Sequence, residues 1–255
     1  MRTTVTKSFG ALLPVAALLL SGCAAKPPVV VGAEPEEPVF PAEYVLAEDV
    51  EYVEKIKDPW QGLNRGIYRF NYRFDKYVLL PAVIAYINVV PKFARNGIHN
   101  FFTNFANIPR IVNCALQFDG TKTVETTGRF LVNSTVGLAG LFDPATAMGI
   151  PQHYEDFGQT LGVWGVPTGP YLVIPLFGPS NVRDATGLFV DFLIYDAARE
   201  AIFNMEYRWQ IPWTTLLAID TRANVQFLYY QTGSPWEYEL VRTLYSTKRE
   251  LDIEK

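Results

Sequence analysis

Apolar side chains recur at helical spacing from residue 60 onward. The first stripe has gaps of three and four positions, which trace one face of a helix. Its members are Trp60, Leu63, Ile67, Phe70, Phe74 and Val78. Arg65, Arg69 and Arg73 form a second, basic stripe. Asp58 followed by Pro59 is typical of a helix start, with an acid at the N-cap and proline in the first turn. The pattern predicts an amphipathic helix that begins at this pair.

Helix signals continue along the chain, whereas alternating strand patterns are few. One helix is expected over about residues 121–137, and Asp143 and Ser180 mark two further starts. The last helix carries a capping box, in which Ser234 and Glu237 are expected to satisfy each other's backbone N–H groups. The pattern therefore predicts an all-α fold.

Residues 158–181 form a stretch of 24 residues without a charged side chain. Its length suits a bilayer span, but nine glycines and prolines interrupt it, and a lipid-exposed backbone must satisfy its polar groups within a helix or closed barrel. Irregular backbone of this kind is tolerated where it lines a cavity or is covered by protein. We interpret the stretch as a candidate channel wall, with a buried core loop as the alternative.

The first residues read as an export signal. Arg2 and Lys7 precede an apolar run at residues 9–20, which is too short to span a bilayer. The ending Leu20-Ser21-Gly22-Cys23 resembles a bacterial lipobox. We expect residues 1–22 to be removed and Cys23 to be acylated, since several acyl chains anchor a protein firmly. A plain secreted protein with a chance cysteine is the alternative.

The segment that follows differs in composition from the rest of the chain. Residues 23–57 are rich in proline and acidic side chains, which favour an extended tether, and residues 58–255 are expected to form the helical domain. Position 24 is alanine and not the aspartate that usually retains such lipoproteins in the inner membrane. By that resemblance, the destination is the periplasmic face of the outer membrane.

Charge and composition narrow the function classes. The chain has 255 residues, of which 49% are apolar, and a formal net charge of −4, which disfavours a nucleic-acid binder. Residues 59–118 nevertheless hold seven basic side chains and one acidic side chain. A basic, aromatic-rich segment suits a surface against anionic headgroups, although an ordinary solvated face would have the same charge.

Catalytic and metal-binding signals are weak. His99 and His153 have no histidine or cysteine partner at metal-ligand spacing, and no nucleophile elbow or phosphate-binding loop is present. Cys114 is most simply a small buried side chain. We therefore predict no enzyme activity, no cofactor and no metal site.

Ten short segments stand in consistent order between residues 58 and 223: 58–65, 70–72, 90–97, 129–137, 140–143, 156–162, 165–171, 175–178, 183–184 and 221–223. The longest block, made up of 165–171, 175–178 and 183–184, includes much of the glycine- and proline-rich stretch. Together these segments resemble one family, the VacJ/MlaA-type outer-membrane phospholipid-transport lipoproteins.

This resemblance implies a ring of amphipathic helices with a central channel in the inner leaflet of the outer membrane. The channel would carry mislocalised phospholipid toward the periplasm, beside a trimeric porin and a soluble periplasmic lipid-carrier protein. The charged residues expected along the lipid path are Arg183, Asp184 and Arg222. The packing or gating residues expected on the first helix are Asn64, Phe70 and Asn71. A structural lipoprotein that supports porin assembly or envelope integrity is the alternative, and a lipolytic enzyme is a third.

Overall fold

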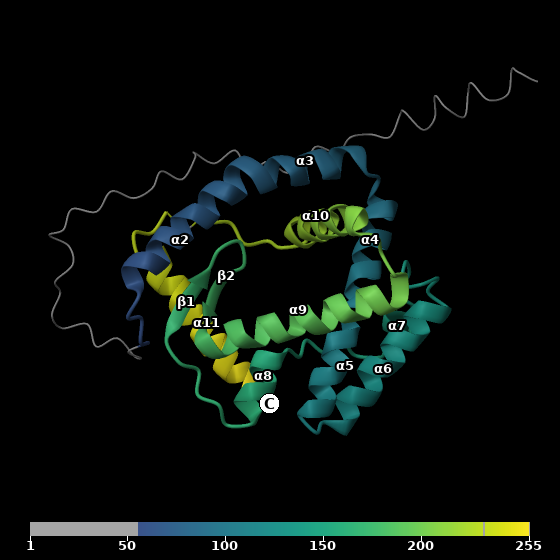
Figure 1. The fold of residues 1–255 in the computed structure, drawn as a ribbon. Coiled ribbons are helices and arrows are strands. Elements are labelled where there is room, and N and C mark those ends of the chain that lie inside the picture. Colours follow the sequence, from purple (N-terminus) through teal and green to yellow (C-terminus); the bar gives the residue numbers. More distant parts are fainter. Residues whose placement is uncertain (1–55, 232, 255) are drawn as a thin grey trace, which may run out of the picture. The chain divides into compact units, whose positions relative to one another are not determined.

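Helices form most of the chain between Gln61 and Ile253 (Figure 1), which confirms the all-α prediction. This computed structural model describes residues 56–231 and 233–254, all of which belong to the compact unit Glu36–Lys255. The predicted signal peptide, Cys23 and nearly all of the predicted tether lie outside the described residues. Within the described part, no helix combines the length and apolar character that crossing a membrane requires.

Among the described residues, the helices follow one another along the chain, and one antiparallel β-hairpin lies between the eighth and ninth helices. They are α2 (Gln61–Phe74), the π-helix η2 (Asp75–Leu79), α3 (Leu80–Val89), α4 (Lys92–Phe105), α5 (Asn107–Leu116), α6 (Gly120–Thr135), α7 (Pro144–Ala147), α8 (Phe157–Val163), β1 (Tyr171–Ile174), β2 (Gly178–Asn181), α9 (Val182–Phe203), α10 (Tyr207–Ala223) and α11 (Glu237–Ile253). Tyr171 pairs with Asn181 and Ile174 with Gly178 in the hairpin.

Side-chain caps start four of the helices. Asp119, Asp143 and Asp156 each accept a hydrogen bond from the backbone N–H three residues ahead, at the starts of α6, α7 and α8. The predicted start at Asp143 is thus confirmed. The start predicted at Ser180 is wrong, because strand β2 continues to Asn181, and the Asn181 side chain caps α9 instead.

The first and last helices begin later than their sequence signals predict. Helix α2 begins at Gln61, while the Asp58 carboxylate accepts hydrogen bonds from Asn64 and from Tyr238 of α11. Helix α11 begins at Glu237, whose buried carboxylate accepts a hydrogen bond from the Tyr68 hydroxyl at 2.8 Å. Both acids therefore bind side chains of other helices, and tertiary contacts take precedence over local capping.

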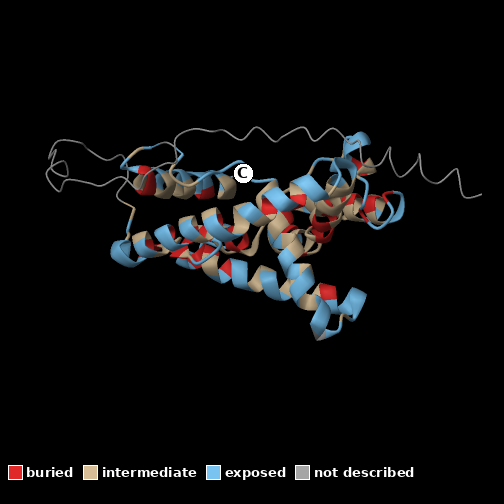
Figure 2. Ribbon diagram, turned by 90° about the horizontal axis from the view of Figure 1, so that it is seen from above, coloured by how far each residue is buried: buried red, intermediate tan, exposed pale blue. Residues whose placement is uncertain are grey.

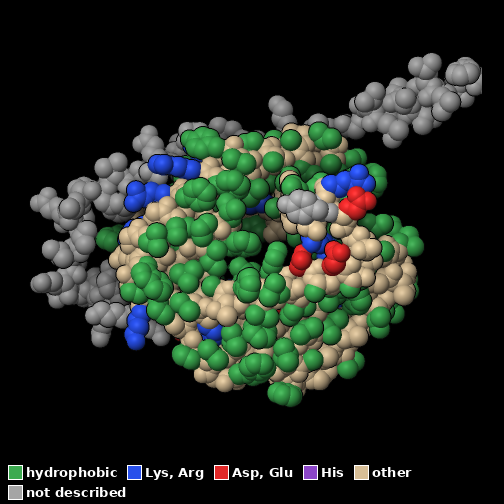
Figure 3. Space-filling view, viewed as in Figure 1, with side chains coloured by type: hydrophobic (Ala, Val, Ile, Leu, Met, Phe, Trp, Pro, Cys, Tyr) green, Lys and Arg blue, Asp and Glu red, His purple; other side chains and the backbone are tan. Residues whose placement is uncertain are grey.

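The helices contact one another in a closed cycle within this unit (Figure 1). Helix α2 packs on β1, the hairpin on α9, α9 on α5, α5 on α4, α4 on α10, and α10 on α3, which continues through η2 into α2. Helices α6 and α7 attach to the outside of this cycle through α4 and α5. The space-filling view is hollowed near its middle (Figure 3). These contacts agree with the expected ring-like arrangement.

Helices α8 and α9 cross at a pair of glycines. A Cβ atom added to Gly187 of α9 would lie 2.2 Å from the backbone nitrogen of Gly158 and 2.6 Å from its Cα. Because both contacts are with backbone atoms, no side-chain rotation relieves them. The crossing therefore depends on the absence of a side chain at Gly187.

Gly187→Ala should destabilise the fold by forcing α8 and α9 apart. We expect the free energy of unfolding to fall by roughly 1–3 kcal/mol, the usual range for overpacking, as measured by denaturant unfolding in a mild detergent. Gly66→Ala is the matched control, since nothing lies within 4 Å of a Cβ at this exposed helical position, and it should gain up to about 1 kcal/mol. Equal effects at the two glycines would contradict the close crossing.

Candidate lipid-facing surface and polar interior

Burial in this chain is inverted relative to an ordinary soluble domain. Among the described residues, 19 buried side chains are polar or charged and only 10 are apolar, while 38 large apolar side chains are exposed. Figure 2 shows exposed positions along the outer sides of the helices, and Figure 3 shows hydrophobic side chains over much of one face. Soluble monomers seldom expose a continuous apolar surface of this kind, which marks contact with lipid or protein.

Helix α2 illustrates the inversion. Its buried residues are Asn64, Tyr68 and Asn71, whereas Leu63 and Phe70 on the apolar stripe are 64% and 51% exposed. The expectation that Phe70 packs against the ring is wrong, because the polar side of the helix faces the interior. Its ring stacks only on the neighbouring Phe74 of the same helix, at 6.3 Å between centroids.

Asn64 and Asn71 attach α2 to the hairpin by replacing a neighbouring strand. The Asn64 side chain accepts from the Val173 backbone N–H at 2.9 Å and donates to the Tyr171 carbonyl at 3.2 Å. About two turns further along the same helix, Asn71 donates to the Ile174 carbonyl at 3.0 Å and accepts from the Leu176 backbone N–H at 2.8 Å. A carboxamide suits this position because it carries both a donor and an acceptor.

Asp184, near the start of α9, is the centre of a buried polar network. Its carboxylate accepts from the Arg249 Nε at 2.7 Å, from the Tyr245 hydroxyl at 2.8 Å and from the Arg183 Nε at 3.0 Å. Arg249 also donates two hydrogen bonds, of 2.7 and 2.8 Å, to Asp156 at the cap of α8. The network therefore joins α8, α9 and α11 through charge-assisted bonds.

Electrostatics in the network favour the charged forms of Asp184 and Arg249. Burial favours the neutral acid, but the hydrogen bonds and charge of Arg249 hold the pKa of Asp184 below its ordinary value. Burial likewise opposes ionisation of Arg249, yet the hydrogen bonds to Asp156 and Asp184 raise its pKa. A buried ion pair of this kind is compatible with folding, whereas one buried charge without its partner would lower the stability of the fold.

Arg222 forms a separate ion pair with Asp75 of the π-helix. The Arg222 Nε and Nη2 donate to the two carboxylate oxygens of Asp75 at 2.6 and 2.9 Å, and the two side chains are 13% and 8% exposed. A third donor of Arg222 binds the Val225 carbonyl at 3.0 Å. This bidentate pair joins the end of α10 to the long helix formed by α2, η2 and α3.

The three charged residues expected along the lipid path are thus engaged in structural contacts. Arg183 binds Asp184, Asp184 binds Tyr245 and Arg249 of α11, and Arg222 binds η2. The expectation that they face one water-filled opening has no support in these contacts. The competing interpretation, ion pairs that hold helices together, fits the observed geometry.

Several residues that hold the interior together could not be identified from the sequence. Arg249, Asp156 and Asn133 are examples: Asn133 donates to Asp143 at 2.9 Å and accepts from the Ala145 N–H at 3.0 Å, which attaches α7 to α6. Seven buried asparagines act at such junctions or beside them. No local pattern distinguishes a buried asparagine from an exposed one, since its partners lie elsewhere in the chain.

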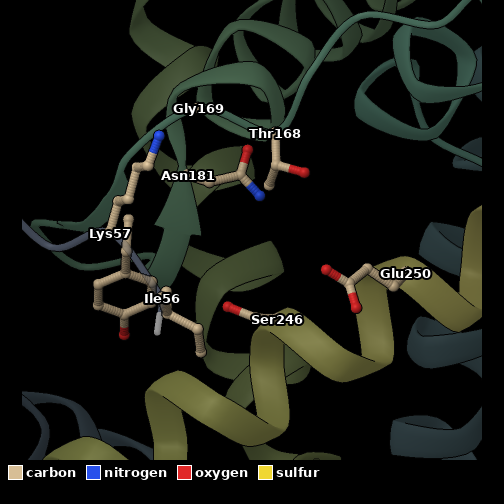
Figure 4. A pocket seen from close by; sticks show the side chains of 8 residues that line it. Ile56, Lys57, Thr168, Gly169, Asn181, Ser246 and Glu250 are labelled. Carbon is tan, nitrogen blue, oxygen red and sulfur yellow. The ribbon is translucent and has the colours of Figure 1, made fainter. Parts of the chain in front are cut away.

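A small cavity opens beside the hairpin (Figure 4). Its volume is about 140 Å³, and Thr168 and Asn181 lie across it from Ser246 and Glu250 of α11. The remaining lining residues are Ile56, Lys57, Gly169 and Tyr171. A cavity of this volume holds a few water molecules and is far smaller than a phospholipid.

Both histidines contact carboxylates. His99 Nδ1 lies 2.9 Å from Asp220, which also accepts from the Tyr86 hydroxyl, and His153 Nε2 lies 2.7 Å from Glu125. Within residues 56–231 and 233–254, no group of three histidine, cysteine, aspartate or glutamate side chains is arranged to hold a metal ion.

The MlaA lipoprotein family profile matches residues 56–252. The chain belongs to the MlaA lipoprotein family. This confirms the resemblance found in the ten sequence segments. The match covers all of the contacts described above, from Asp58 at the first helix to Arg249 in the Asp184 network.

Individual relatives agree with this assignment. The intermembrane phospholipid transport system lipoprotein MlaA of Escherichia coli is 35% identical over 197 residues, which are 74% of this chain and 75% of that protein. An uncharacterized protein of Rickettsia felis is 38% identical over 132 residues, which are 52% of this chain and 53% of that protein. The chain thus spans about half the length of the Rickettsia relative.

A solved structure has the same fold. It comes from work on the structural basis for maintenance of bacterial outer membrane lipid asymmetry, and it superposes with a TM-score of 0.60 at 28% identity. The superposition covers 77% of this chain and 99% of the solved chain. The ring of helices is therefore shared with a member of known structure.

Arg222→Leu should destabilise this MlaA-family chain because it leaves the Asp75 carboxylate buried without its partner. We expect a loss of roughly 3–5 kcal/mol in the free energy of unfolding. Adding Asp75→Leu should recover most of that loss, because an apolar pair can replace a buried ion pair. Arg208→Leu is the control, since Arg208 and its partner Glu206 are both about 70% exposed, and it should cost less than about 1 kcal/mol. An unchanged stability of Arg222→Leu would argue against a structural pair.

Asp191 should make stability depend on pH. It accepts hydrogen bonds from Asn113 Nδ2 at 2.7 Å and from the Phe157 N–H at 2.8 Å, and burial raises its pKa to about 6. The folded state holds the Asp191 proton more tightly than the unfolded state does. The contribution of Asp191 to stability is therefore complete below about pH 4 and is lost as the pH rises through 6. Between those pH values, the free energy of unfolding of the wild-type protein should fall by roughly 1–2 kcal/mol relative to that of Asp191→Asn. Parallel pH profiles of unfolding would exclude this role.

Proposed function

We propose that this chain is the outer-membrane lipoprotein of an intermembrane phospholipid transport system. It removes mislocalised phospholipid from the outer leaflet and thereby maintains the lipid asymmetry of the outer membrane. The inverted burial carries the proposal: a closed cycle of helices exposes apolar side chains to acyl chains and keeps polar side chains inside. The named function of the E. coli relative supports it.

The exposed apolar surface supports a membrane location. We propose that the domain lies in the inner leaflet of the outer membrane, at the periplasmic face, and that Cys23 carries the acyl chains that anchor it. The apolar sides of the helices would embed the domain in the leaflet. The proline- and acid-rich segment before residue 58 serves as the tether.

Passage of lipid follows the hollow at the middle of the ring (Figure 3). A phospholipid headgroup that crosses an apolar layer needs polar surroundings, since an unsolvated charge costs several kcal/mol. We propose that polar groups along the hollow supply such surroundings, while the acyl chains remain against apolar side chains. A trimeric porin beside the ring and a soluble periplasmic lipid carrier below it are the proposed partners.

The test uses a Gram-negative host that lacks its own MlaA. Phosphatidylethanolamine at the cell surface is measured with an amine reagent that does not cross the membrane. The wild-type chain should return surface labelling to its normal level. Leu63→Glu with Phe70→Glu should fail to do so, because charges on the exposed apolar stripe of α2 oppose embedding. Cys23→Ser should fail for lack of the anchor.

Gln61→Glu is the matched control, because it adds a charge at an exposed polar position of the same helix. It should restore normal labelling. All variants are compared at equal protein level in membrane fractions. If the wild-type chain is present in the outer membrane and surface labelling still stays high, the transport function is refuted and the structural-lipoprotein alternative takes its place.

A further inference from the structure

The basic stripe of α2 lies on a side of the helix that the fold leaves uncovered along much of its length. Its members, at intervals of four residues, are Arg65, Arg69 and Arg73. Arg65 is partly buried against α11, where it pairs with Glu239 and lies 4.7 Å from the centre of the Tyr238 ring. Arg69 and Arg73 are exposed, and within the described part of the chain no carboxylate pairs with Arg69. The two exposed arginines therefore present their charges to the surroundings of the ring.

The surface near this stripe has no acidic side chain of its own to balance it. Residues 59–118, which include α2, α3, α4 and α5, contain seven basic side chains and one acid, Asp75. That acid is buried and bound through both carboxylate oxygens to Arg222. A solvated helix face typically alternates the two signs of charge, whereas a surface of one sign attracts a partner of the opposite sign. The charge pattern therefore indicates an anionic partner.

The basic and apolar stripes occupy different sectors of the same helix. Successive residues turn by about 100° around a helix axis, which places the basic stripe roughly 110° from Leu63 and Phe70 and about 130° from the buried side. Helix α2 thus has a polar inner side, an apolar outer side and a basic outer side. Basic side chains lie beside hydrophobic ones at the upper left of Figure 3, where α2 lies in the same view of Figure 1.

This arrangement is typical of a helix that lies in the plane of a membrane interface. Such a helix places its apolar side among acyl chains and its basic side at the level of the headgroups. Arginine suits the boundary because its apolar stem can lie along the acyl layer while its charged end reaches the phosphates.

We propose that Arg69 and Arg73 bind the headgroups of anionic phospholipid, and that the side of the ring that carries them faces the headgroup region of the leaflet. The proposal rests on the membrane location proposed above and adds a lipid class and an orientation to it. The guanidinium group pairs with phosphate oxygens through two parallel hydrogen bonds. A zwitterionic headgroup has no net charge to attract the stripe, whereas an anionic surface should strengthen binding roughly fivefold for each basic side chain near it.

The experiment measures which lipid the full chain retains. The purified chain is reconstituted into vesicles of equal parts phosphatidylglycerol and phosphatidylcholine, extracted again in a maltoside detergent, and analysed by native mass spectrometry. Wild type should retain phosphatidylglycerol over phosphatidylcholine by about fivefold or more. Extraction at roughly 0.5 M NaCl should reduce that preference, because salt screens exposed charges.

The variants test whether the two arginines cause the preference. Arg69→Gln with Arg73→Gln should lower the ratio of the two retained lipids at least about fivefold, and Arg69→Gln alone should give an intermediate ratio. Arg69→Lys with Arg73→Lys should keep most of the preference, since the charges remain. Arg208→Gln, at an exposed arginine of α10, is the matched control and should retain lipid like wild type. Because the substituted positions are exposed, all variants should unfold at the temperature of wild type in detergent alone.

The outcomes separate this proposal from the transport function. Equal retention of the two lipids by wild type, or retention of neither, overturns the anionic-lipid site, while restoration of normal surface labelling would still support transport. An unchanged lipid ratio in the arginine-to-glutamine variants also overturns the site and would leave an acidic protein surface as the partner of the stripe.

Discussion

Hydrogen bonds between buried polar side chains are the interaction on which the rest of this structure depends. In the proposed lipid leaflet, apolar side chains gain little from contact with one another, because acyl chains offer them an equally apolar environment. Directional contacts must then determine which helices adjoin. The Asp184 network joins α8, α9 and α11, and the Asp75–Arg222 pair joins η2 to α10.

The same principle positions the β-hairpin formed by β1 and β2. Two strands alone are marginal, and Asn64 and Asn71 provide the missing edge with four hydrogen bonds to its backbone. Helices α8 and α9 cross closely at Gly187, where any side chain would hold the two backbones apart. The interior is therefore specified by complementary polar groups and close backbone contact more than by apolar volume.

Local sequence signals predicted that helices form, but they predicted the first residue of each helix correctly in only some cases. The start at Asp143 could be predicted because its cap bonds a backbone N–H only three residues away. Ser180 and Glu237 were misleading because strand pairing and the Tyr68 hydroxyl, respectively, provide competing partners from distant parts of the chain. Arg222 was expected along a lipid path, whereas its ion pair with Asp75, 147 residues away, makes it a contact between helices.

The helical class, the amphipathic stripe of the first helix and membership of the MlaA family could all be predicted from the sequence, because periodicity and motif order are visible along the chain. Which side of each helix faces inward became clear only from the folded structure. A stripe at Leu63 and Phe70 fits a buried core and a lipid contact equally well. The partners of Asn64 and Asn71 decide between them, and those partners lie more than 100 residues away, beyond the reach of any local pattern.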